Sequence, residues 1–324
     1  MEKKTKWRWG KNRWFILLFT ILGAIAAHYF PPVRPEILVA PEAISSSITL
    51  PIVGNVSLTN TLVASMIISI LLILMALAVR NTLKKGDLAP KGITGALEML
   101  VEYLYNMTES TAGKWAKTIF PYFMTIVLVV LLSNWVELLP GVDSFGWLEH
   151  SATEGHATME LLPGLTATVA GEVAQGQGAV VVPWVRVPST DLNFTIALAL
   201  ISVVMTQVIG LRAQGIRYFS KFFNTTTLFK KPFFGVMDWA VSILELISEF
   251  SKVLSFAFRL FGNIFAGSVL LFIVGSLIPV FAQSAILVFE FAIGLIQALV
   301  FGLLTMVFMS MATRGHGEHE ESHS

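Results

Sequence analysis

The last part of the chain contains the stretch SKVLSFAFRLFGNIFAGSVLLFIVGSLIPVFAQSAILVFEFAIGLIQALVFGLLTMVFMSMA, residues 251–312. This stretch is nearly free of charge and far longer than the ~20 residues that cross the hydrocarbon core of a bilayer once. Apolar residues also extend before it, from Met237 onward. We therefore predict a hairpin of two membrane helices, over residues 237–276 and 278–312. Because each arm exceeds one membrane thickness, the arms should tilt or project beyond the bilayer.

Arg259 is the residue of this hairpin that most needs a physical explanation. No charged side chain follows it until Glu290. A guanidinium in hydrocarbon costs about 3 kcal/mol on insertion scales and about 10–17 kcal/mol in simulations of an isolated helix. Arginine also keeps its charge in any protein environment. A charge at this depth should face protein, water or a counter-charge, which indicates a functional site.

Composition places the whole chain in a membrane. Of its 324 residues, 55% are hydrophobic and 13% are charged, whereas a soluble domain carries about 25% charged residues. The chain has no cysteine, which excludes disulfides, thiolate nucleophiles and Cys-type zinc sites. It also contains no Gly-rich phosphate loop. We expect no cofactor, no metal, no nucleic acid and no directly bound nucleotide.

The rest of the sequence predicts an all-α integral membrane protein with about five transmembrane helices. Besides the hairpin, the predicted spans are Leu58–Val79, Pro121–Leu139 and Asn193–Leu211. Residues 92–117 mix apolar and charged positions, as an amphipathic helix on the membrane surface does. A basic start precedes the apolar run Trp14–Ala27, which fits either a cleaved signal peptide or a retained anchor helix.

Three regions follow from these spans. Residues 1–57 form a basic start, an apolar segment and a linker, residues 58–313 a membrane domain, and residues 314–324 a polar tail. An insertion over residues 141–187 interrupts the membrane domain. It contains His150 and His156 among acids, which leaves two interpretations open. The insertion is either a zinc-binding or pH-sensing segment or an ordinary solvated loop. The His- and Glu-rich tail poses the same choice between metal binding and a flexible terminus.

Loop charges predict the orientation. Basic residues dominate the connections over residues 80–117 and 212–231, whereas acids dominate residues 141–191. Lys and Arg gather in cytoplasmic loops. We therefore expect the 141–191 loop outside and the C-terminus in the cytoplasm.

Polar residues line up with Arg259 when both arms are counted outward from a turn near Ile278 at 1.5 Å per residue. Arg259 and Gln297 then share one depth. Asn263 lies one turn further out, and Glu290 lies near the level of Gly267. On the inner side, the residues that approach Arg259 along the helix are Glu245, Glu249, Lys252 and Ser255. Ionisable groups thus approach a fixed positive charge from both sides, as in an interrupted proton path.

Four segments now point to a family. They are SKVLSFAFRLFGNIFAG (251–267), NWVELLP (134–140), PSTDLN (188–193) and QALVFGLLT (297–305). In their order along the chain they resemble subunit a of F-type ATP synthases, the stator part of a rotary proton channel. The resemblance covers roughly residues 58–140 and 188–313. It does not cover the insertion or the first 50 residues.

The resemblance implies that Arg259 faces the c-ring, drives the proton off each passing c-subunit carboxylate and blocks leakage between two offset half-channels. The positions that it implies for the outer half-channel are Asn134, Glu137, Asn263, Ser268, Glu290 and Gln297. Those that it implies for the inner half-channel are Glu245, Glu249, Lys252 and Ser255. Ser268 departs from the family, which often has an acid or His there, so Glu290 would act without a second titratable group. Val253 stands where many members have Pro.

Further expectations follow from the family. The partners would be the c-ring, the peripheral-stalk subunit b and membrane lipid, in a bacterial inner or plasma membrane. The subunit would have no catalytic site of its own. Two alternatives are a stand-alone secondary transporter, for which no inverted repeat is visible, and a purely structural anchor, which has no use for Arg259. The sequence leaves open whether the coupling ion is H⁺ or Na⁺.

Overall fold

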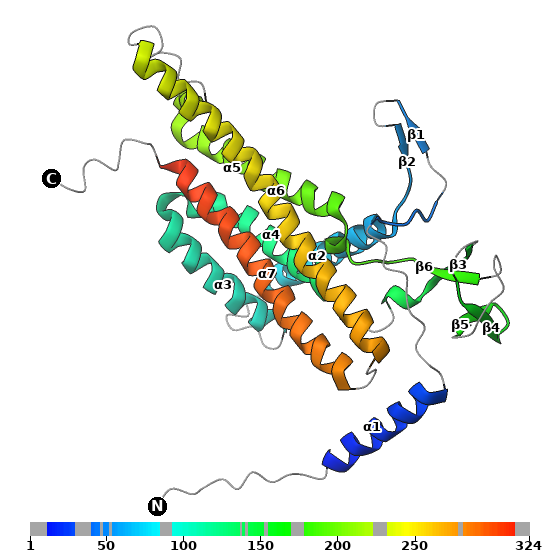
Figure 1. Cartoon of the computed structure of the whole chain (residues 1–324). Coiled ribbons are helices and arrows are strands. Elements are labelled where there is room, and N and C mark those ends of the chain that lie inside the picture. Colours follow the sequence, from blue (N-terminus) through cyan, green and yellow to red (C-terminus); the bar gives the residue numbers. More distant parts are fainter. Residues whose placement is uncertain are drawn as a thin grey trace, which may run out of the picture.

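The computed structural model describes residues 12–29, 40–45, 48–51, 54–84, 93–136, 138–139, 142–151, 155–169, 178–222, 232–277 and 281–314. The α-helices among them are α1 (Asn12–Tyr29), α2 (Asn60–Lys84), α3 (Ile93–Ala112), α4 (Ala116–Val136), α5 (Leu192–Gln214), α6 (Pro232–Leu277) and α7 (Phe281–Thr313). The strands are β1 (Ile48–Leu50), β2 (Gly54–Val56), β3 (Gly146–Ser151), β4 (Ala157–Leu162), β5 (Leu165–Val169) and β6 (Gly178–Pro183). Figure 1 shows the long helices bundled together, with the strands outside the bundle.

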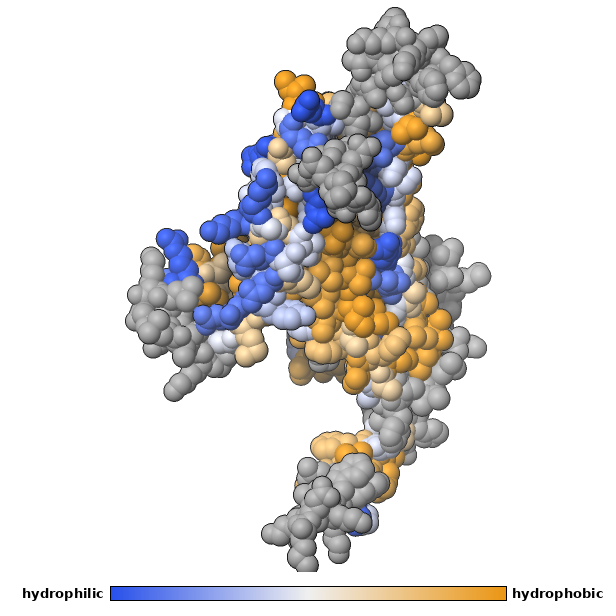
Figure 2. Space-filling model, turned by 90° about the vertical axis from the view of Figure 1, so that its left-hand side faces the viewer, coloured by the Kyte–Doolittle hydropathy of each residue, from blue (hydrophilic) through white to orange (hydrophobic). Residues whose placement is uncertain are grey.

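Five helical segments of the described chain are long and apolar enough to cross a membrane. Their bounds are Asn60–Asn81, Leu97–Val136, Leu192–Phe219, Trp239–Gly275 and Gln283–Thr313. The predicted all-α membrane architecture is therefore confirmed. The apolar part of α1, Arg13–Ile25, is shorter, and its length fits a signal segment and a short anchor alike. Figure 2 shows one lateral face, where hydrophobic side chains form a broad zone bordered by hydrophilic ones.

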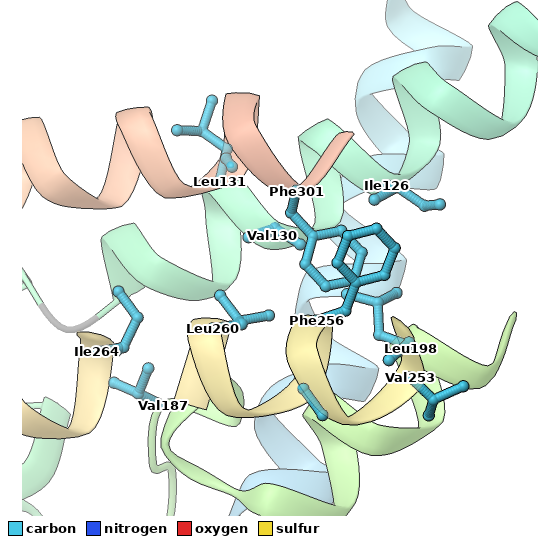
Figure 3. Close-up of a cluster of buried hydrophobic side chains, with 13 residues drawn as sticks. Ile126, Val130, Leu131, Val187, Leu198, Val253, Phe256, Leu260, Ile264 and Phe301 are labelled. Carbon is cyan, nitrogen blue, oxygen red and sulfur yellow. The ribbon is translucent and has the colours of Figure 1, made fainter. Parts of the chain in front are cut away.

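Side chains from α4, α5, α6 and α7 form the main core. Phe256 of α6 and Phe301 of α7 lie at its centre with ring centroids 5.0 Å apart, and Figure 3 shows the two rings against each other. Leu260 of α6 and Val130 of α4 are fully buried beside them. A buried hydrogen bond of 2.7 Å between Ser202 of α5 and Thr305 of α7 crosses the same interface. This core fixes the face that α6 turns toward its neighbours, and hence where Arg259 lies.

The predicted amphipathic helix is α3, followed by a short 3-10 turn, Gly113–Trp115. Its apolar side packs on α4 and α7 through buried Leu104. Glu98, Glu102 and Glu109 are exposed. Thr111, near the end of α3, accepts hydrogen bonds from the side chains of Ser310 and Arg314 at the end of α7. These contacts attach α3 to the end of the hairpin.

The described part of the insertion contains four β-strands, which the sequence analysis did not predict. β3 pairs with β6, and β4 pairs with β5, both antiparallel. His150 lies on β3, and the backbone of His156 bridges to Ala179 of β6. Within the described residues, no group of three His, Asp or Glu side chains gathers closely enough to hold a metal ion.

A buried polar junction joins the start of α2 to the start of α5. Asp191 caps α5 by accepting a hydrogen bond from the backbone N–H of Asn193. Its other carboxylate oxygen accepts a 2.7 Å hydrogen bond from the Thr61 hydroxyl. The neighbouring Asn60 donates a 2.9 Å hydrogen bond to Glu42, which precedes α2. Because Asp191 is 6% exposed, these bonds replace the water that its carboxylate would otherwise need.

Candidate functional site

Arg259 lies half-buried on a lateral face of α6. Its Nη2 donates a 3.2 Å hydrogen bond to Ser255, one turn earlier on the same helix. No carboxylate of the described residues pairs with its guanidinium. Neighbouring positions on this face, such as Ser255, Asn263 and Ala266, are exposed. The charge is therefore held at the surface of the bundle and points away from the main core.

Asn263 and Gln297 connect α6 to α7. The Asn263 amide donates a 2.8 Å hydrogen bond to the Gln297 carbonyl oxygen. Gln297 is 4% exposed, and its Nε2 has no hydrogen-bond acceptor among the described residues. The sequence count placed Gln297 level with Arg259. In the structure, the partner of Gln297 is Asn263, which lies one turn further along α6 than Arg259. The helices end at Leu277 and begin again at Phe281, so the two arms pair in a slightly later register than a turn near Ile278 gives.

Glu290 of α7 is buried against Gly267 of α6. An ideal Cβ placed on Gly267 would lie 2.6 Å from Glu290 Cδ, so the carboxyl group occupies the space that any other residue would fill. Glu290 is 4% exposed, and its Oε1 has no donor among the described residues. The predicted level of Glu290 beside Gly267 is confirmed. Ser268 follows Gly267, and its hydroxyl donates to the Ile264 carbonyl at 3.0 Å.

The end of α4 holds α7 in the turn after Glu290. Asn134 donates a 3.1 Å hydrogen bond to the carbonyl of Gly294. The Trp135 indole donates a 3.3 Å hydrogen bond to the carbonyl of Phe291 and stacks on the Phe291 ring with centroids 4.6 Å apart. Asn134 Oδ1 and Ser133 Oγ are buried with no hydrogen-bond partner in the described part of the chain. Gly294 permits this approach, because a Cβ there would lie 3.1 Å from Asn134.

On the other side of Arg259, α6 carries a buried ion pair. Lys252 lies 3.0 Å from Glu249, whose side chain is 10% exposed. The Lys252 ammonium also lies 4.9 Å from the centre of the Phe308 ring on α7, a distance suited to a cation–π contact. Glu245 is half-buried one turn before Glu249. The predicted inner residues thus make two separate contacts. Ser255 accepts a hydrogen bond from Arg259, and Glu249 forms an ion pair with Lys252.

A family model described as ATP synthase A chain matches residues 62–310. The chain belongs to this family. ATP synthase subunit a of Acidothermus cellulolyticus is 25% identical over 295 residues, with 89% of this chain and 90% of the relative covered. ATP synthase subunit a of Psychromonas ingrahamii is 30% identical over 246 residues, with coverages of 72% and 78%. For ATP synthase subunit a 2 of Vibrio campbellii, the identity is 29% and the coverages are 74% and 83%.

Membership of the ATP synthase subunit a family makes the chain a multi-pass membrane subunit of an ATP synthase complex, which works in ATP synthesis and proton transport. The long helices α2, α4, α5, α6 and α7 lie within or overlap the matched residues. The strands β3–β6 also fall within the matched range, although the motifs quoted above lie outside this insertion.

Within this subunit a, the structure brings together most of the predicted site residues and adds some. Asn263 meets Gln297, Asn134 reaches α7 beside Glu290, and Glu137 lies outside the described residues. The residues that the sequence analysis did not single out are Ser133, Trp135 and Gly294, and Gly267 entered it only as a marker of depth. The glycines carried a usable signal, since a glycine inside a long apolar helix often marks a close approach of another group.

Proposed function

We propose that this subunit forms two offset proton half-channels that meet at Arg259, and that Arg259 faces the c-ring of the same ATP synthase. The observation that carries the proposal is the guanidinium itself, which has no carboxylate partner among the described residues and lies on a lateral face of α6. A charge at membrane depth needs a counter-charge. A carboxylate on a passing c subunit supplies one, and Arg259 then displaces the proton from that carboxylate.

The outer half-channel in this proposal runs past the end of α4 and between α6 and α7. Its support is a group of buried polar atoms that have no hydrogen-bond partner in the described chain, namely Ser133 Oγ, Asn134 Oδ1, Glu290 Oε1 and Gln297 Nε2. Buried polar atoms without protein partners are normally satisfied by ordered water. Water beside Glu290 would relay protons toward Asn263 and Arg259. Glu137 and Ser268 belong to this path in the proposal by their positions in the sequence.

The inner half-channel follows α6 from Arg259 through Ser255 to the Lys252–Glu249 pair and Glu245. Small exposed residues, Ser251 and Ser255, lie along this part of α6, and small side chains let another helix approach closely. Along α6, Asn263 and Ser255 are separated by about 12 Å at 1.5 Å per residue. Arg259 lies between them, so its fixed charge opposes direct proton passage from one path to the other.

The orientation of the subunit and its second protein partner are also part of the proposal. Basic loops over residues 80–117 and 212–231 support a cytoplasmic location for those connections and for the C-terminus. The insertion then faces the outer side of a bacterial inner or plasma membrane. From family membership, we propose the peripheral-stalk subunit b as the second partner beside the c-ring.

ATP-driven proton pumping by the complex in vesicles tests this function. Arg259→Ala and Arg259→Lys should abolish pumping while the complex still assembles, because neither side chain provides the guanidinium fork at this point. Arg212→Ala is the matched control, since Arg212 is exposed at the end of α5. Normal pumping by Arg259→Ala would contradict the proposal, and loss of assembly in that variant alone would favour a structural anchor. Repeating the assay with and without Na⁺ identifies the coupling ion.

A further inference from the structure

The β4–β5 hairpin of the insertion has one apolar and one polar face. Side chains alternate between the two faces of a sheet, and directly paired residues share a face. The apolar face is formed by Ala157 with Val169, Met159 with Ala167, and Leu162 with Leu165. The register shifts between Glu160 and Leu162, so that Leu162 joins this face. The polar face is formed by Thr158 with Thr168 and Glu160 with Thr166. The apolar face carries no charged group.

Much of this apolar face is open. The exposed fractions of Met159, Leu162 and Leu165 are 42%, 62% and 46%. Leu162 and Leu165 also flank the Pro163-Gly164 turn, although turns are normally built from polar residues, Gly and Pro. A two-stranded hairpin is marginally stable in water by itself. An exposed apolar surface of this kind marks a contact with a membrane or another molecule.

The base of the insertion carries exposed aromatic side chains close to the ends of two membrane helices. Phe145 follows the end of α4, and Trp184 precedes the start of α5. The Trp184 backbone N–H donates to the Phe145 carbonyl at 3.1 Å, and the Trp147 and Trp184 rings lie 5.6 Å apart. All three side chains are about half exposed or more. Tryptophans at such helix ends are typical of the membrane–water interface.

We propose that the β4–β5 hairpin lies on the lipid–water interface of the membrane that α4 and α5 cross, with its apolar face toward the acyl chains. β3 and β6 connect the hairpin to the aromatic base and are six residues long, or about 20 Å. This short tether keeps the hairpin close to the surface where the aromatic base lies. Figure 1 shows β3, β4, β5 and β6 grouped together beside the helices. The lipid contact is thus continuous with that of the helices, and Thr158 and Glu160 face water.

Single-cysteine labelling tests this placement, because the chain contains no cysteine. Nitroxide labels are introduced by Met159→Cys or Leu165→Cys on the apolar face, and by Thr158→Cys or Thr166→Cys as matched controls on the polar face. All four side chains are exposed, so the labels need no repacking. Each labelled chain is assembled into a complex whose other subunits have had any cysteine replaced. This complex is placed in vesicles of phosphatidylcholine and phosphatidylglycerol. Collision rates with oxygen and with a water-soluble nickel chelate are then measured.

Labels at positions 159 and 165 should show an oxygen-to-nickel collision ratio several-fold higher than labels at positions 158 and 166. Equal ratios on the two faces would overturn the proposal, because the hairpin would then stand in water. Low collision rates with both reagents at 159 and 165 would also overturn it, and would indicate a protein partner or a second copy of the chain. As a second measurement, Leu162→Glu, which changes the residue paired with Leu165, should raise the nickel accessibility of the label at position 165, and an unchanged value would count against a lipid contact.

Discussion

The contact between Gly267 and Glu290 gives the sharpest prediction about the site. Replacing Gly267 by Ala puts a Cβ 2.6 Å from Glu290 Cδ, well inside the ordinary contact distance of about 3.5–4.0 Å. The carboxyl end of Glu290 must then move. Overpacking of this kind costs about 1–3 kcal/mol. We expect the barrier to proton transfer through the displaced Glu290 to rise by a similar amount. ATP-driven proton pumping by Gly267→Ala should then fall about five- to hundredfold, since 1.4 kcal/mol corresponds to a factor of ten.

Two controls separate displacement of Glu290 from a general effect of alanine on α6. A Cβ on Gly275 of the same helix would lie 3.4 Å from Gln283, an ordinary contact distance. Gly275 also lies more than four helical turns from Arg259, so Gly275→Ala should pump at the wild-type rate. Glu290→Asp shortens the side chain by one methylene and should relieve the overlap. The double variant Gly267→Ala/Glu290→Asp should therefore pump faster than Gly267→Ala alone, with a coupling of about 1 kcal/mol between the two sites.

The assay is the initial rate of ATP-driven acidification in vesicles that contain equal amounts of complex. Wild-type pumping by Gly267→Ala would refute the buried contact with Glu290. The same conclusion would follow if the effects of Gly267→Ala and Glu290→Asp were simply additive, because residues in direct contact should couple.

Two further predictions concern the contacts that hold the helices. Asp191→Ala removes the cap of α5 and the acceptor of the buried Thr61 hydroxyl, so it should lower the stability of the complex by about 2 kcal/mol. Thermal unfolding in detergent measures this. Thr61→Ser keeps the hydroxyl and loses only a buried methyl group, so it should cost about 1 kcal/mol, and a loss as large as that of Asp191→Ala would contradict the role of the hydrogen bond. Lys252→Ala leaves the buried Glu249 carboxylate without its lysine and should lower the stability of the complex by about 1–3 kcal/mol. Adding Glu249→Gln removes the unpaired charge and should recover part of that loss. A double variant no more stable than Lys252→Ala would argue against the ion pair.

Hydrophobic length made the membrane helices predictable. The predicted spans correspond to α2, α4, α5, α6 and α7, with ends that differ by a few residues. α4 shows why ends are harder to predict. It begins at Ala116 and includes Pro121, which we had taken as the start of the span. Pro121 is the sixth residue of α4, beyond the first turn, so it removes one intrahelical hydrogen bond. Membrane helices tolerate such a proline because neighbouring groups satisfy the freed backbone carbonyl.

The insertion was harder to read from sequence. Its strands are five or six residues long, and Gly, Pro and acidic residues surround them, so a polar loop seemed the simpler interpretation. The alternation in Leu165-Thr-Ala-Thr-Val169 was a period-two signal that we did not use. Pairing between β3 and β6 links residues far apart in the sequence, and local patterns do not specify such pairing.

The site was predictable in part because charge is costly in lipid. That cost singled out Arg259 and Glu290 from residue type and depth alone. The contact of Asn263 with Gln297 and the approach of Trp135 to Phe291 depend on how the helices cross and where each helix ends. A shift of one residue in the turn moves a facing partner by 1.5 Å along the helix, so counting alone could not assign these pairs.

Proton leakage through a stationary rotor tests the central role of Arg259 most directly. A pH gradient is imposed on vesicles that carry the complete complex without nucleotide, and its decay is followed with a pH-sensitive dye. If Arg259 separates two polar paths, the wild-type complex holds the gradient, and Arg259→Ala, at the same content of assembled complex, dissipates it several-fold faster. An Arg259→Ala complex that is fully assembled and as tight as the wild type would contradict this account.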